Sequence, residues 1–164
     1  MTIAVCPGSF DPVTLGHIDI IRRASRMFDL VVVAVMTNPA KSPSFTAKER
    51  VELLSRVTKN MPNVEIDEFD GLLAEYTREK KAAAIVKGLR AVSDFEYEFQ
   101  MALTNKKLNP DVETVFLTTS AEYMYLSSSI VKQVASFGGD ISGFVAEETL
   151  EDIKKRLCKG GSPT

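Results

Sequence analysis

The sequence is poor in the residues that usually build metal sites and disulfide frameworks. Its 164 residues include two cysteines, one histidine and no tryptophan. Cys6 and Cys158 are far apart in the chain and lack the C-x-x-C spacing of a zinc or redox motif. We therefore expect neither a metal site nor a disulfide, and we expect both cysteines to be the reduced thiols of a cytoplasmic protein.

The chain also lacks long apolar runs and an excess of positive charge. No stretch approaches the roughly 20 apolar residues that cross a membrane, and the opening "MTIAVCPGS" has neither the basic start nor the apolar core of a signal peptide. The formal net charge is −2, whereas general nucleic-acid binders are usually strongly basic. We expect no membrane or nucleic-acid partner, and any phosphate chemistry must use a local cluster of basic groups.

What the chain does have is a regular alternation of short apolar runs and helical patterns. Hydrophobic residues make up 45% of it, enough for a sizeable core. Strands are predicted at residues 2–6, 30–36, 63–69, 83–89 and 113–119. Helices are predicted at residues 17–28, from Thr46 through Val57, at 72–80 and 93–108, from Ser128 to the stop at Gly138 and Gly139, and at 147–157. Thr46 and Glu49 fit a capping box.

This order predicts an α/β fold in one domain, residues 1–158, followed by a frayed tail, residues 159–164. We expect a doubly wound, five-stranded parallel sheet of the Rossmann-like type, with helices on both faces. Ligands of such sheets bind beyond the carboxyl ends of the strands, at the topological switch point. The loops that follow the strands are therefore the candidate functional segments.

The loop after the first predicted strand, "PGSFDPVTLGH", contains the only histidine. Gly8 allows the backbone to approach a ligand closely. Gly16 and His17 fall in the first turn of the next helix, where exposed N–H groups and the helix dipole favour an anion. A histidine there either contacts a bound phosphate or makes a capping hydrogen bond, and its position alone does not decide between the two.

Later strand-end loops carry polar and basic groups as well. The segment "YLSSSIVK" places three serines at a helix start, where hydroxyl and N–H groups suit an anion, although N-capping alone explains one serine. Lys87 and Arg90 flank Gly88 after the fourth strand, and Lys41 lies in the loop after the second. Charged loop residues are commonly only solvated, but strand ends are where α/β sites form.

Thr14, Gly16 and His17 resemble the T/H-x-G-H signature of the nucleotidyltransferase superfamily, whose polar side chains bind the triphosphate of a nucleotide. The segments "PGSFDPVTLGHIDII", "NPAKSPSFTAKER", "VKGLRAVSDFEYEFQMALTNKKL" and "YLSSSIVK" together resemble the bacterial phosphopantetheine adenylyltransferase family, in order and at its spacing. The resemblance implies the penultimate step of coenzyme A biosynthesis. In that step ATP and 4′-phosphopantetheine give dephospho-CoA and pyrophosphate.

The resemblance also implies a set of site residues. The catalytic residues would be His17, Lys41, Arg90 and Ser9. ATP would contact Ser9, Phe10, His17, Gly88, Leu89, Arg90, Glu98, Tyr123, Met124, Tyr125, Leu126, Ser127, Ser128 and Ser129. Phosphopantetheine would contact Ser9, Lys41, Leu73 and Lys87. Two positions depart from the family: Lys87 replaces a common arginine and loses its bidentate fork, and Tyr123 replaces a common tryptophan.

Members of that family are similar in being homohexamers that use Mg²⁺, so the resemblance implies both here, with CoA as a feedback inhibitor. Mg²⁺ would be held mainly by the ATP phosphates and water. The phosphate monoester nucleophile has a second pKa of about 6 and needs no general base. We therefore expect direct in-line transfer, with His17 stabilising charge on the α-phosphate.

Two other interpretations of the sequence are open at this point. One is a related nucleotidyltransferase that acts on nicotinamide mononucleotide or a CTP-dependent substrate. The other is a catalytically silent nucleotide-binding regulator, which would bind ATP and release no pyrophosphate. Lys41, Lys87 and the "DFEYE" segment favour the pantetheine branch over the first alternative. The presence of every expected phosphate-binding residue argues against the second.

Overall fold

A computed structural model of the chain describes residues 1–38, 40 and 42–158. Its parallel strands are β1 (Ile3–Gly8), β2 (Leu30–Met36), β3 (Val64–Phe69), β4 (Ala84–Leu89) and β5 (Glu113–Thr118). The helices are α1 (Leu15–Ser25), α2 (Ala47–Thr58), α3 (Leu73–Glu79), α4 (Val92–Leu108), α5 (Ser128–Ser136) and α6 (Glu147–Leu157), and a short 3₁₀ helix, η1 (Ala121–Tyr123), follows β5. The predicted tail, residues 159–164, lies outside the described residues.

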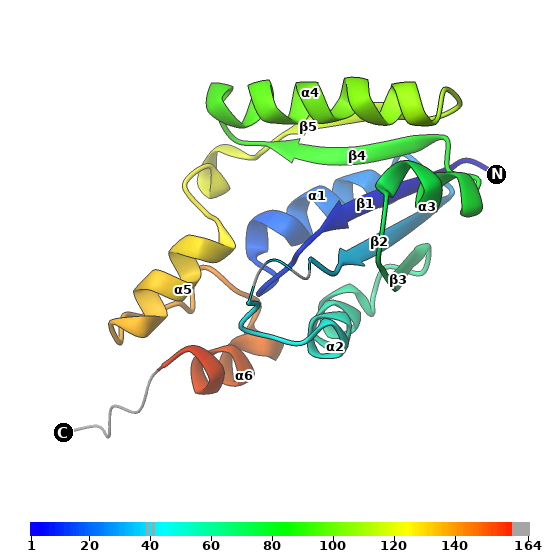
Figure 1. The fold of residues 1–164 in the computed structure, drawn as a ribbon. Coiled ribbons are helices and arrows are strands. Elements are labelled where there is room, and N and C mark those ends of the chain that lie inside the picture. Colours follow the sequence, from blue (N-terminus) through cyan, green and yellow to red (C-terminus); the bar gives the residue numbers. More distant parts are fainter. Residues whose placement is uncertain (39, 41, 159–164) are drawn as a thin grey trace.

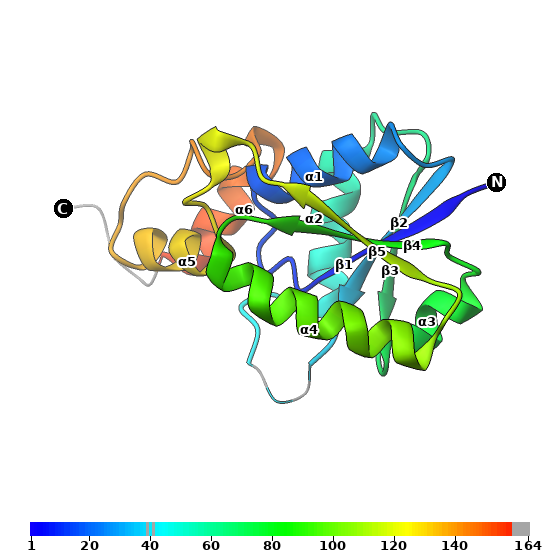
Figure 2. The same ribbon diagram turned by 90° about the horizontal axis from the view of Figure 1, so that it is seen from above.

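The strands form one parallel sheet in the order β3-β2-β1-β4-β5, which confirms the predicted doubly wound α/β fold. The chain builds the sheet outward from β1 through β2 to β3, then returns past β1 to add β4 and β5. Because parallel crossovers are right-handed as a rule, this reversal of direction puts the helices of the two halves on opposite faces. Figure 2 shows α1 on one side of the sheet and α3 with α4 on the other.

Alternating strand residues feed two apolar layers. Along β2, Val31, Val33 and Val35 face the larger core, into which α1, α2, α5 and α6 pack. Val32 and Ala34 face the smaller core, with Tyr76 of α3. β2 is therefore covered on both faces, which explains why its segment is apolar at every position.

The helix α2 begins at the predicted capping box. The Thr46 hydroxyl accepts a hydrogen bond from the Glu49 N–H at 3.2 Å, and the Glu49 carboxylate accepts one from the Thr46 N–H at 2.8 Å. Two N–H groups that the first turn leaves without helical partners are thus satisfied. In the described part of the chain, no helix is both long and apolar enough to cross a membrane.

The neighbouring strands β1 and β4 separate toward their carboxyl ends. β1 stays paired with β2 as far as Gly8, and β4 with β5 as far as Leu89. β1 and β4 pair with each other only at Ala4–Ala84 and Val5–Ile85. Beyond these residues the sheet opens at its switch point, and α5 and α6 lie on that side of the molecule (Figure 1).

Candidate functional site

A cleft of about 260 Å³ lies where β1 and β4 separate. Its floor comes from the ends of the two strands, and its sides come from the starts of α1, α4 and α5. We call it the switch-point cleft. Its lining residues are Cys6, Pro7, Gly8, Phe10, Thr14, Gly16, His17, Ile20, Ile21, Val86, Lys87, Gly88, Arg90, Asp94, Glu98, Thr119, Tyr123, Leu126, Ser127 and Ser128.

His17 is both a capping residue and a wall of this cleft. Its Nδ1 accepts a hydrogen bond from the Thr14 backbone N–H at 3.0 Å, and the Thr14 hydroxyl accepts one from the His17 N–H at 3.3 Å. A nitrogen that accepts cannot carry the proton, so the neutral ring is protonated on Nε2. Burial, reinforced by the positive charges of Arg90 and Lys87, lowers the pKa of His17 to about 4. The ring therefore presents a neutral Nε2–H donor.

Phe10 fixes the other side of the histidine. Its ring stands edge-on to the His17 ring, with the ring centres 5.1 Å apart. The Phe10 backbone has a positive φ of 50°, a conformation that costs free energy in a non-glycine residue. A Cβ on Gly8 would lie 3.0 Å from the Phe10 ring. Gly8 thus leaves room for this ring, whereas its sequence position suggested room for a ligand.

Both cations of the cleft are paired with carboxylates from α4. The Lys87 ammonium lies 3.4 Å from the Glu98 carboxylate, and the Arg90 Nε lies 3.1 Å from that of Asp94. Arg90 also donates to the Leu126 carbonyl at 3.1 Å, which ties the end of β4 to the segment before α5. Lys87 and Arg90 are therefore fixed in direction before any ligand arrives.

The three serines at the start of α5 have three different environments. Ser127 is the N-cap and accepts a hydrogen bond from the Ile130 N–H at 3.2 Å. Ser128 donates to the Pro12 carbonyl at 2.7 Å and so joins α5 to the loop after β1. Ser129 is exposed. Capping therefore accounts for Ser127 alone, and Ser128 is placed by its bond to the Pro12 carbonyl.

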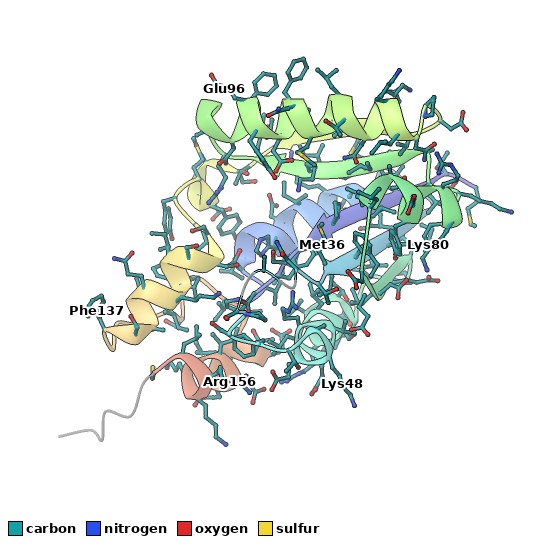
Figure 3. All side chains as sticks on the ribbon, in the orientation of Figure 1. Met36, Lys48, Lys80, Glu96, Phe137 and Arg156 are labelled. Atoms are coloured by element: carbon teal, nitrogen blue, oxygen red, sulfur yellow. The ribbon has the colours of Figure 1, made fainter. Side chains whose placement is uncertain are left out.

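A second cavity of about 510 Å³ adjoins the cleft, and Ser128 lines both. We call it the adjoining cavity. Its other lining residues come from the end of β2, from the loops after β1, β2 and β3, and from α2 and α5. They are Ser9, Asp11, Met36, Thr37, Asn38, Ser42, Pro43, Ala47, Arg50, Asp70, Ser129 and Lys132. Met36, at the end of β2, is labelled in Figure 3.

Two buried charged residues hold the loops around the adjoining cavity. Arg50 donates to the carbonyls of Ser9 at 2.7 Å and Met36 at 3.1 Å. Asp11 accepts from the Lys132 ammonium of α5 at 2.6 Å. These contacts join the loops after β1 and β2 to α5. Sequence reasoning singled out neither Arg50 nor Asp11, because their partners are distant in the chain.

The structure gathers most of the predicted site residues at the carboxyl edge of the sheet. The switch-point cleft contains Phe10, His17, Lys87, Gly88, Arg90, Glu98, Tyr123, Leu126, Ser127 and Ser128, and the adjoining cavity contains Ser9 and Ser129. The described linings of these two sites do not include Leu73, Leu89, Met124 or Tyr125. Lys41 lies outside the described residues. The contacts of all these residues with substrates stay predictions.

Asp94 is a cleft residue that sequence reasoning did not name. It pairs with Arg90 four residues before it and also accepts from the Arg90 backbone N–H at 3.4 Å. The spacing was readable, since oppositely charged residues four apart meet on one helix face. The signal was weak because Arg90 precedes the helix and Asp94 lies in its first turn.

The donor groups of the cleft bear on metal binding. In the described part of the chain, no three or more His, Cys, Asp and Glu side chains come together as a metal site. Asp94 and Glu98, the carboxylates of the cleft, are engaged by Arg90 and Lys87. The Cys6 thiol is also in the lining, but burial raises its pKa to about 12, so it is neutral. These groups suit a cation that is delivered by a ligand's phosphates.

Known proteins share this fold. The cytidylyltransferase-like family model matches residues 5–134. A putative nicotinate-nucleotide adenylyltransferase from Vibrio parahaemolyticus superposes with a TM-score of 0.68 at 20% identity, covering 96% of this chain and 99% of that one. The nicotinic acid mononucleotide adenylyltransferase of Plasmodium falciparum, complexed with NaAD, gives 0.66 at 14% identity, covering 94% and 95%. Fold, cleft and family model together define a nucleotidyltransferase.

Sequence comparison narrows the class. The phosphopantetheine adenylyltransferase of Caldanaerobacter subterraneus subsp. tengcongensis is 63% identical to the chain, over 94% of the chain and 99% of that enzyme. That of Clostridium tetani is 61% identical, over 95% and 98%. The chain belongs to the phosphopantetheine adenylyltransferase family.

Proposed function

We propose that this chain transfers the adenylyl group of ATP to 4′-phosphopantetheine, giving dephospho-CoA and pyrophosphate. The observation that carries the proposal is the junction of the switch-point cleft with the adjoining cavity at Ser128. A transfer between two phosphate compounds needs two neighbouring sites whose contents can meet in line. Family membership supplies the identity of the two substrates.

The lining residues support an assignment of one substrate to each site. Most residues expected on ATP line the switch-point cleft, where Arg90 and the start of α5 offer donors to a triphosphate. Ser9, expected on both substrates, lines the adjoining cavity. We assign ATP to the cleft and the pantetheine arm to the cavity. Lys87, in the cleft, would then contact the phosphate of phosphopantetheine as it approaches ATP.

The state of His17 fits charge stabilisation better than acid–base or covalent chemistry. The nucleophilic phosphate is mostly ionised at neutral pH and needs no base. A neutral Nε2–H can donate to an α-phosphate oxygen as negative charge grows there. The ring lone pair is on Nδ1, already occupied by the Thr14 N–H. Because the Cys6 thiol is also neutral, neither group is prepared to attack phosphorus.

Mg²⁺ belongs to the proposal as a companion of ATP. The cleft carboxylates, Asp94 and Glu98, are already neutralised by Arg90 and Lys87. Phosphate oxygens and water would therefore provide most ligands of the ion, with Ser127 and Ser128 beside the phosphates. The bound ion would supply further neutralisation of the triphosphate charge.

The proposed homohexamer finds support on α4. This helix exposes a run of large apolar side chains: Phe95 (42% exposed), Tyr97 (63%), Phe99 (47%) and Leu103 (57%). Exposed clusters of large apolar side chains commonly mark protein–protein interaction sites. Contact with further copies of the chain would cover these residues, and sedimentation velocity measures the number of copies.

Feedback inhibition by CoA and a cytoplasmic location also belong to the proposal, on the strength of the family resemblance.

One assay separates the proposal from its rivals. Purified protein is mixed with ATP, Mg²⁺ and one second substrate, and pyrophosphate release is followed. The second substrate is 4′-phosphopantetheine in one reaction, nicotinate mononucleotide in another and nicotinamide mononucleotide in a third. We expect release with phosphopantetheine only. Release with a pyridine mononucleotide instead would assign the chain to that branch. ATP binding without release from any of the pairs would identify a silent regulator.

A further inference from the structure

The carboxyl-terminal helix α6 reaches a loop of the site. α6 begins at Glu147, beyond residue 134, where the family-model match ends. It packs beside α2, and Arg156 extends from it (Figure 3). Arg156 donates to the Ser44 carbonyl at 2.8 Å and to the Glu49 carboxylate at 2.5 and 3.1 Å. Its guanidinium carbon also lies 5.1 Å from the centre of the Phe45 ring.

The segment 44–46 that Arg156 contacts is held from the site side as well. The Asp11 carboxylate accepts from the Ser44 N–H at 2.9 Å and from the Phe45 N–H at 2.8 Å. Arg50 donates to the Phe45 carbonyl at 3.2 Å. Asp11 and Arg50 both line the adjoining cavity. Ser44 and Phe45 therefore lie between two sets of charged contacts, one from the cavity and one from α6.

We infer that Arg156 is a positioning residue for the second substrate: from α6 it fixes segment 44–46, and through that segment the wall of the adjoining cavity. The inference rests on the proposed function, because it assumes that the cavity receives phosphopantetheine. The three contact types on Arg156 support it. A bidentate ion pair alone would join α6 to α2, but the bond to the Ser44 carbonyl and the stacking on Phe45 act on the loop itself.

The expected effect is selective for one substrate. Ser42 and Pro43, directly before the segment, line the adjoining cavity, whereas the switch-point cleft is lined from β1, β4, α1, α4 and α5. Loosening segment 44–46 should therefore weaken binding of phosphopantetheine and leave ATP binding nearly unchanged. We expect the Arg156→Gln variant to raise KM for phosphopantetheine about tenfold, the scale of one lost hydrogen bond to a charged group.

Arg56 provides a matched control at the same helix pair. It bridges α2 and α6 through Asp152 at 2.6 Å and the Glu148 carbonyl at 3.2 Å, and it also pairs with Glu52 of α2 at 3.4 Å. None of these partners belongs to segment 44–46. Arg56→Gln should lower thermal stability to a similar degree as Arg156→Gln while leaving both KM values within about twofold of wild type.

The experiment measures KM for each substrate, kcat and thermal stability for the two glutamine variants and for Arg156→Lys. Lysine keeps the charge but cannot span the Ser44 carbonyl and both Glu49 oxygens, so its KM for phosphopantetheine should fall between those of wild type and Arg156→Gln. Equal KM changes in the Arg56 and Arg156 glutamine variants would show that α6 only stabilises the fold. An unchanged KM in Arg156→Gln would also overturn the inference.

A second readout does not depend on catalysis. Hydrogen exchange of the Ser44 and Phe45 amides, both bound to Asp11, reports the order of the segment directly. We expect about tenfold faster exchange in Arg156→Gln and wild-type exchange in Arg56→Gln. If the wild-type protein releases no pyrophosphate with phosphopantetheine, the proposed function fails, and this exchange result still decides the role of Arg156 on the loop.

Discussion

The single histidine allows a direct test of the chemistry assigned to the cleft. The Thr14 N–H donates to His17 Nδ1, and burial with two nearby cations lowers the pKa of the ring to about 4. We predict that the imidazole of the ligand-free protein is neutral throughout the physiological pH range, with its proton on Nε2. Protonation of Nδ1 would remove the acceptor of the Thr14 N–H, so acid should loosen the start of α1 as well.

The size of the effect follows from linkage. The ordinary pKa of 6.5 applies to the unfolded chain, and the value of about 4 applies to the folded protein. Well above pH 6.5 the ring is neutral in both states, so it contributes nothing to the pH dependence of the free energy of unfolding. As the pH falls from 6.5 toward 4, only the unfolded chain takes up the proton, so the folded protein loses stability. At about 1.4 kcal/mol per pKa unit, the loss approaches roughly 3 kcal/mol.

The measurement is an NMR titration. With one histidine in the sequence, the ring signals of His17 need no assignment by mutation. Long-range proton–nitrogen spectra should show the Nε2–H tautomer, with a titration midpoint near 4. A midpoint at 6.5 or above, or a dominant Nδ1–H tautomer, would refute the reasoning. Urea unfolding of His17→Asn gives a control, because an amide oxygen can accept the Thr14 N–H but does not titrate.

Three further predictions concern catalysis and packing. Replacing His17 with alanine should lower kcat by about 10²–10³-fold, the scale of a lost oxyanion donor, and an unchanged kcat in steady-state assays would show that the residue only caps α1. ATP carrying a chiral α-thiophosphate should react with inversion at phosphorus, as followed by ³¹P NMR of the product, whereas retention requires a covalent intermediate. Leu54→Ala, which truncates a fully buried side chain of the larger core, should cost about 2–5 kcal/mol in urea unfolding; a loss well under 1 kcal/mol would contradict the packing.

The fold was predictable because the apolar runs, the helical patterns and the capping residues of the sequence agree with the elements that the sheet and its helices form. The apolar run 30–36 coincides with β2, and Thr46 with Glu49 marks the true start of α2. The predicted helix 147–157 coincides with α6. The 3₁₀ helix η1 was not predicted, since three residues are too few to show a periodicity. The cap of α1 was only one of two possibilities for His17, because histidine replaces the usual Glu or Gln at the third helical position of the capping box.

The site was predictable as a list of loops but not as a set of contacts. Strand ends pointed to Lys87 and Arg90, yet the pairing of Lys87 with Glu98 depends on how α4 lies relative to β4, and that of Arg90 with Asp94 on where α4 begins. The sequence left two possibilities for His17, phosphate contact or capping. The structure shows the capping bond, which uses Nδ1 alone. A phosphate contact through Nε2 in the cleft is therefore compatible with capping. Arg50 and Asp11 hold the loops of the site through hydrogen bonds to backbone groups far away in the chain, and no sequence pattern indicates such partners.

The pairing of each cleft cation with a carboxylate affects how the protein selects among anions. Glu98 and Asp94 are internal competitors: a phosphate that approaches Lys87 or Arg90 has to take the place of a carboxylate already there. An anion with a single phosphate gains little from such an exchange, because it gives up its own hydration for one contact. A triphosphate replaces several contacts at once and brings its own cation. We therefore expect the cleft to discriminate by the number of linked phosphates, and to stay open to ATP in a solution rich in inorganic phosphate.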